Sequence, residues 1–541
     1  MAALPQYSYI FGIGIVFAFL DAWNIGANDV ANAFATSVSS RSLTLPQAMG
    51  IAVVMEFAGA VLAGARTAGT IRNDIIAVEA FEDSPSVLML GMLCALIGSS
   101  LFLTLATKIG LPVSTTYCII GGIIGVGFAT VGASVFAAWG IAPCVAACFG
   151  ALLFLFTKYG VLRAKNPLRA GMITKGAASL DLDDWGTAPT VGTIFSVAGG
   201  VGLLSITFLL SYIHVLLEII KGPLLLRRPA PPPMPEDVQL VPDYYRGHKT
   251  REELEASTSD SNATAEATSD EDSVRNGKAE TADEKAPTAV LKPRSPKTPL
   301  GKAITRPQGS WLSPMHWLRI INWAFWRGVS VDVVNQQSNT NEAKWLQRFL
   351  VGNNLADKHA RVKHYDPKVE HLFSFLQVLT AATAAFTHGA NDVANAMGPL
   401  AAIYSIWQTN VVTDDSEVPI WILVFGGAAI SIGCWTYGYN LIRNLGNRIT
   451  LHSPWRGFCM ELGAALTVVM ATRLALPVST TQCIVGTTVG VGLCAGDLKA
   501  INWRMVAWSY SGWFITLPCT AVVAGCLMAF VINAPQFGNA L

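Results

Sequence analysis

The stretch GANDVANA occupies residues 26–33 and occurs a second time at residues 389–396. The hexapeptide LPVSTT is also present twice and in the same order, at residues 111–116 and 476–481. The two copies of each motif are 363 and 365 residues apart, and chance does not produce two long identities at nearly the same offset. The sequence therefore predicts two copies of one structural unit.

The composition is that of a membrane protein. Of the 541 residues, 52% are hydrophobic and 13% are charged, and the mean hydropathy is +0.43. Residues 221–370 hold 22 of the 37 Lys and Arg and 19 of the 36 Asp and Glu, so the remainder has too little polar surface to face water. Apolar segments of about 20 residues, the length that crosses a bilayer, fall at 9–35, 47–66, 87–107, 113–131, 133–157, 191–217, 371–403, 419–441, 456–474, 478–494 and 506–533.

These segments predict an all-α polytopic membrane protein with about 10–12 transmembrane segments. Several segments are interrupted by glycines, which is typical of the discontinuous or re-entrant helices and inverted repeats of secondary transporters. We predict a first membrane repeat at 7–220 and a second at 371–533. Between them, 221–370 is rich in Ser, Thr, Pro and mixed charge, which predicts a largely disordered cytosolic loop.

Other function classes fit less well. A formal net charge of +1 argues against nucleic acid as a partner. The ten cysteines lie in apolar stretches without ligand spacing, so we predict no transition metal and no cofactor. An intramembrane aspartyl protease would need one shared pair of aspartates, whereas each aspartate here has its own asparagines and its own LPVSTT motif. We therefore predict that the protein is not an enzyme.

Each GANDVANA motif places an aspartate and two asparagines on about one helical turn. An aspartate in an apolar span costs several kcal/mol unless it meets a cation, a partner or a cavity. Close helix packing through Gly and Ala, with asparagine as interhelical glue, is the simpler interpretation. It does not explain an aspartate in both copies, so we favour an ion site formed by Asn28, Asp29, Asn32, Asn391, Asp392 and Asn395.

Each LPVSTT motif predicts a helix start, with Pro112 and Pro477 in the first turn and three hydroxyls following. Hydroxyls beside the free N–H groups of a helix N-terminus form an anion site. An ordinary N-cap would account for one such motif. Two copies, each about 85 residues after a GANDVANA motif, favour an anion site built by Ser114, Thr115, Thr116, Ser479, Thr480 and Thr481.

Neither motif contains Arg or Lys, so an anion beside two aspartates needs small cations to offset the repulsion. Oxygen donors suit sodium, and protons on the aspartates are the other option. The anion ligands are then the six hydroxyls with Asn28, Asp29, Asn391 and Asp392. The expected sodium ligands are Asp29, Asn32, Glu56, Asp392, Asn395 and Glu461.

Four further residues have no counterpart in the other copy. Glu56 and Glu461 lie at different distances from their motifs, so each is either a coupling-ion ligand or a buried structural acid. Asp21 corresponds to Ala384, and we predict a structural role for it. His388 corresponds to Ile25, and we predict that it lies outside the core chemistry.

With these motifs the sequence resembles the inorganic phosphate transporter (PiT) family, whose members carry the same paired motifs and, in eukaryotes, a long hydrophilic central loop. The segments PPPMPEDVQLVPDYYRG and NWRMVAWSYSGWFITLP look closest to the fungal plasma-membrane members that couple phosphate to sodium. The resemblance implies phosphate and sodium as partners, a lipid bilayer and a homodimer. In one departure, residues 163–190 have no apolar run where such relatives have a further span.

We therefore predict a cation-coupled symporter, with sodium preferred, that carries inorganic phosphate across the plasma membrane by alternating access. A proton-coupled symporter and a phosphate-sensing receptor on a transporter scaffold are the alternatives.

Overall fold

The computed structural model describes residues 3–73, 81–130, 241–256, 307–309, 313–331, 333–334, 355–412, 418–473, 478–495 and 497–534. Within these ranges the chain forms helices and no strands. Nine of the eleven predicted apolar segments are helices, and the other two, 133–157 and 191–217, lie outside the described residues. The nine are α1 (Ser8–Ser39), α2 (Leu45–Ala63), α4 (Pro85–Ile109), α5 (Thr115–Thr130), α14 (Pro367–Thr409), α15 (Ile420–Tyr437), α17 (Pro454–Arg473), α18 (Thr480–Cys494) and α19 (Trp503–Asn533).

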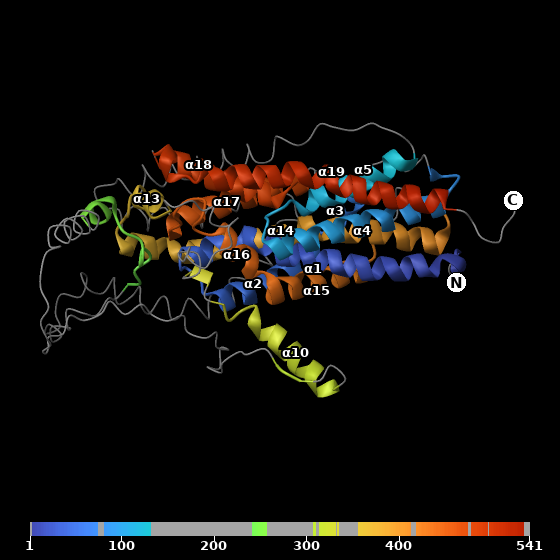
Figure 1. The fold of residues 1–541 in the computed structure, drawn as a ribbon, viewed down its shortest axis with the longest axis horizontal. Helices are drawn as coiled ribbons and strands as arrows, with labels where there is room; N and C mark the ends of the chain where they lie inside the picture. Colours follow the sequence, from blue (N-terminus) through green and yellow to red (C-terminus); the bar gives the residue numbers. More distant parts are fainter. Residues whose placement is uncertain are drawn as a thin grey trace, which may run out of the picture.

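The two GANDVANA motifs lie on α1 and α14, which run antiparallel through the middle of the bundle (Figure 1). Near the start of α1, Ser8 Oγ accepts a hydrogen bond of 3.2 Å from Trp407 Nε1 at the end of α14. Just beyond the end of α1, Ser40 Oγ donates to Gln377 Oε1 at 2.7 Å, near the start of α14. Helices α1 and α14 therefore run in opposite directions, and an inverted repeat of the two whole halves stays a prediction.

Glycines let each GANDVANA helix pack closely on a helix of the other half. A methyl group placed on Gly26 of α1 would lie 2.0 Å from the carbonyl oxygen of Ile430 in α15. The same group on Gly389 of α14 would lie 2.2 Å from the carbonyl oxygen of Glu56 in α2. Helix packing is therefore the reason for the motif glycines, and it makes Glu56 and Ile430 the corresponding positions of the two halves.

The described residues of the LPVSTT motifs, 111–116 and 478–481, lie at the inner ends of two helical hairpins, which enter the bundle from opposite ends (Figure 1). Helix α4 ends at Gly110, whose φ of 75° is left-handed, and α5 begins only at Thr115. Pro112 is thus in the non-helical connection and not in the first helical turn, because Ser114 is the residue that caps the helix by accepting a hydrogen bond from Tyr117 N. Pro477 lies outside the described residues.

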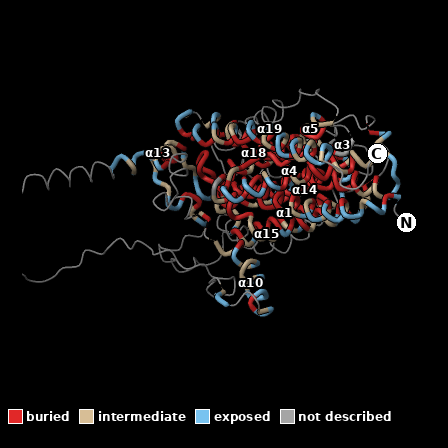
Figure 2. Tube along the Cα trace, turned by 45° about the vertical axis from the view of Figure 1, so that its right-hand side comes forward, coloured by how far each residue is buried: buried red, intermediate tan, exposed pale blue. Residues whose placement is uncertain are grey.

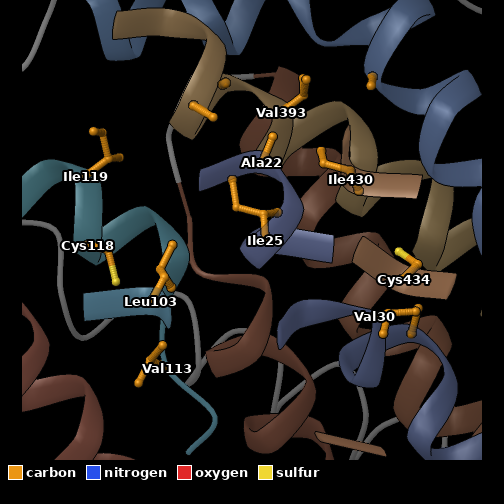
Figure 3. Close-up of a cluster of buried hydrophobic side chains, with 14 of the residues drawn as sticks. Ala22, Ile25, Val30, Leu103, Val113, Cys118, Ile119, Val393, Ile430 and Cys434 are labelled. Atoms are coloured by element: carbon orange, nitrogen blue, oxygen red, sulfur yellow. The ribbon is translucent and has the colours of Figure 1, made fainter. Parts of the chain in front are cut away.

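The interior is continuous across the two halves. Figure 2 shows buried residues along the centre of the bundle and exposed ones around it. Figure 3 shows apolar side chains from both halves meeting there, among them Ala22 and Ile25 of α1, Leu103 of α4 and Ile430 of α15. Six described helices are long and apolar enough to cross a membrane, and α5 and α18 are shorter apolar helices, as expected of discontinuous spans.

Parts of the polar interval are also described. Helix α10 (Pro314–Arg327) projects from the bundle and exposes large apolar side chains, including Leu318 and Ile321 (Figure 1). Residues 241–256 pack on the end of the bundle where α14 begins, beside helix α13 (Leu355–Ala360). Residues 163–190, where the sequence lacks an expected span, lie outside the described residues.

Candidate functional site

Asp29 lies at the centre of the bundle, where both hairpin tips reach it. Its side chain is 1% exposed. Thr115 Oγ1, from the hairpin of the same half, donates to Asp29 Oδ2 at 2.8 Å. Thr481 Oγ1, from the hairpin of the other half, lies 3.2 Å from Asp29 Oδ1. One carboxylate therefore joins elements that are 452 residues apart in the chain.

Asp392 has the corresponding place on α14. Thr480 Oγ1 donates to Asp392 Oδ2 at 2.9 Å, as Thr115 does to Asp29. Asn391 Nδ2 lies 2.5 Å from Asp392 Oδ1, and the aspartate is fully buried. The structure thus brings the two motif aspartates and the two sets of predicted threonine hydroxyls into one buried cluster.

The second asparagine of each motif crosses to the hairpin of the opposite half. Asn32 Nδ2 donates to Thr481 Oγ1 at 2.8 Å. Asn395 Nδ2 donates to Thr116 Oγ1 at 3.3 Å and to Thr115 Oγ1 at 3.2 Å. The threonines also bond the opposite tip, because Thr116 Oγ1 donates to Val478 O at 3.2 Å and Thr481 Oγ1 lies 3.1 Å from Val113 O. Each half thus makes the same kinds of contact with the hairpin of the other half, as expected for two units related by an approximate two-fold axis.

The first asparagine of each motif holds the hairpin of its own half. Asn28 Nδ2 donates to Thr107 Oγ1 and to Leu111 O, both at 3.2 Å. Asn391 Nδ2 donates to Val478 O at 2.9 Å. These side chains therefore position the non-helical connections from which the hydroxyls project.

The two predicted serines are helix caps. Ser479 Oγ accepts from Gln482 N at 3.3 Å, and Ser114 Oγ accepts from Tyr117 N at 3.2 Å. Each serine oxygen thus satisfies one free N–H at a helix N-terminus that points into the cluster. The N-cap interpretation holds for the serines, and no described residue accepts their hydroxyl protons.

The prediction that His388 lies apart from the motif aspartates is wrong. We set it aside because its counterpart is Ile25, yet its ring is 2% exposed and lies between three carboxylates. Its Nδ1 is 2.5 Å from Glu56 Oε2. Its Nε2 is 2.8 Å from Asp392 Oδ2 and 3.8 Å from Asp29 Oδ2, without being aligned for a hydrogen bond to either. The available signal was its position four residues before Asp392, on the same face of a helix.

The two predicted glutamates are in different places. Through His388, Glu56 is part of the aspartate cluster. Glu461 instead accepts hydrogen bonds from Thr36, from Ser37 at 2.5 Å, from Thr380 at 2.8 Å and from Gln377 at 3.2 Å. The structure therefore separates Glu461 from the other predicted sodium ligands.

One possible ligand atom from each of Asp29, His388 and Asp392 lies within 4.8 Å of the others, a spacing at which side chains could hold a metal ion. Three further oxygen acceptors are buried there without a hydrogen-bond partner, namely Asn32 Oδ1, Glu56 Oε1 and Asn391 Oδ1. Helix N-termini and hydroxyls attract an anion, and unpaired carboxylate and amide oxygens attract cations. This arrangement suits an anion that enters together with cations.

A buried site of this kind, between two matched halves and at the tips of broken helices, is typical of secondary transporters. Residues 25–524 match the phosphate transporter family, and the chain belongs to that family. The family resemblance inferred from the motifs is thus confirmed. So is the prediction that the protein is not an enzyme, because the family members and relatives are transporters and permeases.

Individual relatives cover almost the whole chain. The phosphate-repressible phosphate permease of Neurospora crassa is 46% identical, with 99% of each chain covered. A putative phosphate permease of Pyrococcus furiosus is 31% identical over 95% of this chain and 94% of its own. The sodium-dependent phosphate transporter 1 of Mus musculus is 26% identical, over 98% and 96%.

A solved structure described as the sodium-dependent phosphate transporter matches with a TM-score of 0.60 and 25% identity. It covers 98% of this chain and 100% of its own. Together with the apolar helices, this match confirms the predicted class of a helical membrane transporter, and the protein is a phosphate transporter.

Proposed function

We propose that this chain is a sodium-coupled phosphate symporter that works by alternating access around the Asp29–Asp392 cluster. The observation that carries the proposal is the convergence of two motif aspartates with hydroxyls from both hairpin tips. In this proposal the phosphate ligands are Asn28, Asp29, Asn391, Asp392 and the hydroxyls of Ser114, Thr115, Thr116, Ser479, Thr480 and Thr481.

A charge count supports cation coupling. The cluster holds three carboxylates, from Asp29, Asp392 and Glu56. In this proposal the imidazole of His388 is protonated, because a ring with N–H on both nitrogens can face Glu56 Oε2 and Asp392 Oδ2 at the same time. Three negative charges and one positive charge leave a net charge of −2 before phosphate binds. At least two monovalent cations must therefore accompany the anion into this low-dielectric site.

The donor set favours sodium over protons. Sodium is a hard cation that takes oxygen ligands. The unpartnered Asn32 Oδ1, Asn391 Oδ1 and Glu56 Oε1 are such ligands, and an amide oxygen cannot hold a proton near neutral pH. In this proposal Asp29, Asn32, Asp392, Asn395 and Glu56 bind the coupling ions, and the role of Glu461 is tested separately below. Two relatives are sodium-dependent by name.

The charge distribution favours a cytosolic position for the central loop. Arg41, Arg448 and Arg456 lie at the end of the bundle where residues 241–256 dock. At the opposite end, the segment before α4 carries Glu82 and Asp83. Because Lys and Arg accumulate on the cytoplasmic side, the loop is cytosolic in this proposal. A plasma-membrane location is expected from the family resemblance alone. A homodimer is expected from the family resemblance alone.

The test is phosphate uptake into vesicles that contain the full chain, with imposed sodium and pH gradients. Wild type should take up phosphate when sodium is supplied and not when only a pH gradient is applied. Asp29→Asn and Asp392→Asn should each lower uptake about 100-fold or more, because removing one buried charge from a compensated set costs roughly 3–5 kcal/mol. The matched control is Thr516→Ala on α19, whose hydroxyl donates to Gly512 O of its own helix and to no other described residue.

Each alternative has a distinct outcome. Uptake driven by the pH gradient in the absence of sodium would establish proton coupling. Phosphate binding without uptake would establish a sensor. Unchanged sodium stimulation in both aspartate variants would refute the site assignment while leaving the transport function intact.

A further inference from the structure

A second group of polar side chains lies between α1 and α4, and its residues on α1 are five and two residues before the GANDVANA motif. Asp21 and Asn24 of α1 are fully buried and share one helix face. Ser99 Oγ donates to Asp21 Oδ1 at 2.8 Å, and Ser100 Oγ lies 3.3 Å from the same oxygen. Asn24 Nδ2 donates to Thr104 Oγ1 at 2.9 Å. The group thus contains one carboxylate, one amide and three hydroxyls.

Two oxygen acceptors of this group are unsatisfied. Asp21 Oδ2 and Asn24 Oδ1 are both buried without a hydrogen-bond partner. Among the described residues, the buried ion pairs all involve His388, and none includes Asp21. A carboxylate in a membrane interior with neither a cationic partner nor a full set of donors is strongly disfavoured. Either its own proton or a bound cation must neutralise it, and a proton on Oδ2 would be a buried donor that meets no acceptor among the described residues.

The other unmatched acid outside the cluster, Glu461, has a different environment. Glu461 receives four side-chain donors that reach both of its oxygens. Asp21 receives donors on one oxygen only. The fold does not require an acid at this position either, since the corresponding residue of α14 is Ala384. The unpartnered oxygens of Asp21 and Asn24 therefore indicate a bound ligand that is coordinated by oxygen atoms.

We propose that Asp21, Asn24, Ser99 and Ser100 form a further sodium site, separate from the Asp29–Asp392 cluster and present in the first half only. A monovalent hard cation fits the set, because one carboxylate neutralises one charge and the amide and hydroxyl oxygens complete an all-oxygen shell. Thr104 is exposed and accepts a hydrogen bond from Asn24, so the site lies next to the surface of the bundle. The site adds one cation to those that accompany phosphate.

The experiment measures binding of radioactive sodium to the purified full-length protein without phosphate. Asp21→Asn should bind one sodium ion fewer per chain than wild type. The same variant should lower the Hill coefficient for sodium in phosphate uptake, because one linked binding event is lost. Thr516→Ala should match wild type in both measurements. An unchanged sodium count in folded Asp21→Asn would overturn the proposal and identify Asp21 as a protonated or structural acid.

Two further variants keep the proposal falsifiable. If Asp21→Asn does not fold, the double variant Ser99→Ala/Ser100→Ala keeps the charge and should weaken sodium binding about 5- to 10-fold, as expected for lost neutral ligands. Unchanged affinity in this variant would also overturn the proposal. Asp29→Asn separates the two sites: it should abolish uptake and still retain the sodium ion that depends on Asp21.

Discussion

The matched and the unmatched parts of the central site differ in how they are built. Asp29 and Asp392 have corresponding threonine partners at 2.8 and 2.9 Å, and Asn32 and Asn395 cross to opposite hairpins. Around this two-fold core, Glu56 and His388 have only Ile430 and Ile25 as counterparts. The matched residues offer a site that is the same from both sides, and the unmatched pair makes it asymmetric.

The asymmetry falls on the second half. His388 Nε2 is 2.8 Å from Asp392 and 3.8 Å from Asp29. In the proposed charge state, with His388 protonated, Asp392 is closer to the positive charge, and Asp29 is left for a bound cation to neutralise. Two equivalent aspartates in sequence thus become unequal in charge environment, which gives cations a preferred place beside Asp29.

The largest expected effect comes from removing the asymmetric pair. His388→Ile installs the counterpart residue and leaves Glu56 and Asp392 without their cation, so uptake should fall by about 100-fold or more. The double variant His388→Ile/Glu56→Ile makes the two halves alike and removes one charge of each sign. It should recover folding, measured as thermal stability, with an altered sodium dependence. If the double variant is no more stable than the single one, Glu56 and His388 are not a coupled pair.

Glu461 tests whether every unmatched acid belongs to ion coupling. Its carboxylate accepts from four side-chain donors, so Glu461→Gln sets an amide N–H2 against some of them. The expected cost is about 1–3 kcal/mol of stability, seen as a lower unfolding temperature. The sodium dependence of the remaining uptake should be that of wild type. A changed Hill coefficient would instead restore Glu461 as a coupling-ion ligand.

The sequence predicted the matched part of the site because repetition marks it. Asp29 and Asp392, with their asparagines and threonines, belong to sequence motifs that are identical in the two halves. Hydropathy predicted the nine apolar helices, among them those that hold these residues. The same reliance on repetition is the reason why His388 was not predicted as part of the site, because histidine is present at this position in one copy only. Its partner Glu56 could not be paired with it from sequence, because that pairing depends on α2 packing against α14 of the other half.

A moderate effect should separate two threonines that the sequence treats as equivalent. Thr481 Oγ1 lies 3.2 Å from Asp29 and accepts from Asn32 at 2.8 Å, whereas Thr116 contacts Asn395 and no aspartate. Thr481→Ala should therefore raise the KM for phosphate about 5-fold more than Thr116→Ala, the effect of roughly 1 kcal/mol for one hydrogen bond. Equal KM values would show that the site is symmetric in function despite its geometry.

The smallest effect concerns the end of the bundle, where the central loop docks without any counterpart in the other half. His248 of the loop lies 3.1 Å from His359 of α13, and Tyr244 Oη lies 2.6 Å from His371 Nδ1. Burial is the main cause that lowers the pKa of His248 to about 3 and that of His359 to about 4. Both rings are therefore neutral when the loop is docked.

An undocked histidine titrates near 6.5, so below about pH 6.5 the undocked loop binds more protons than the docked one, and docking weakens as the pH falls. When the pH is lowered from 7.5 to 5.5, the amides of residues 241–256 should lose about 10-fold of their protection from hydrogen exchange, after correction for intrinsic rates. This factor corresponds to one histidine, His248, that gains a proton when the loop undocks. His248→Gln removes that proton and should flatten the change, while exchange in α18 stays constant. If His248→Gln loses as much protection as wild type, His248 does not cause the pH dependence. The loop would then give no evidence that unmatched residues behave differently from the matched core.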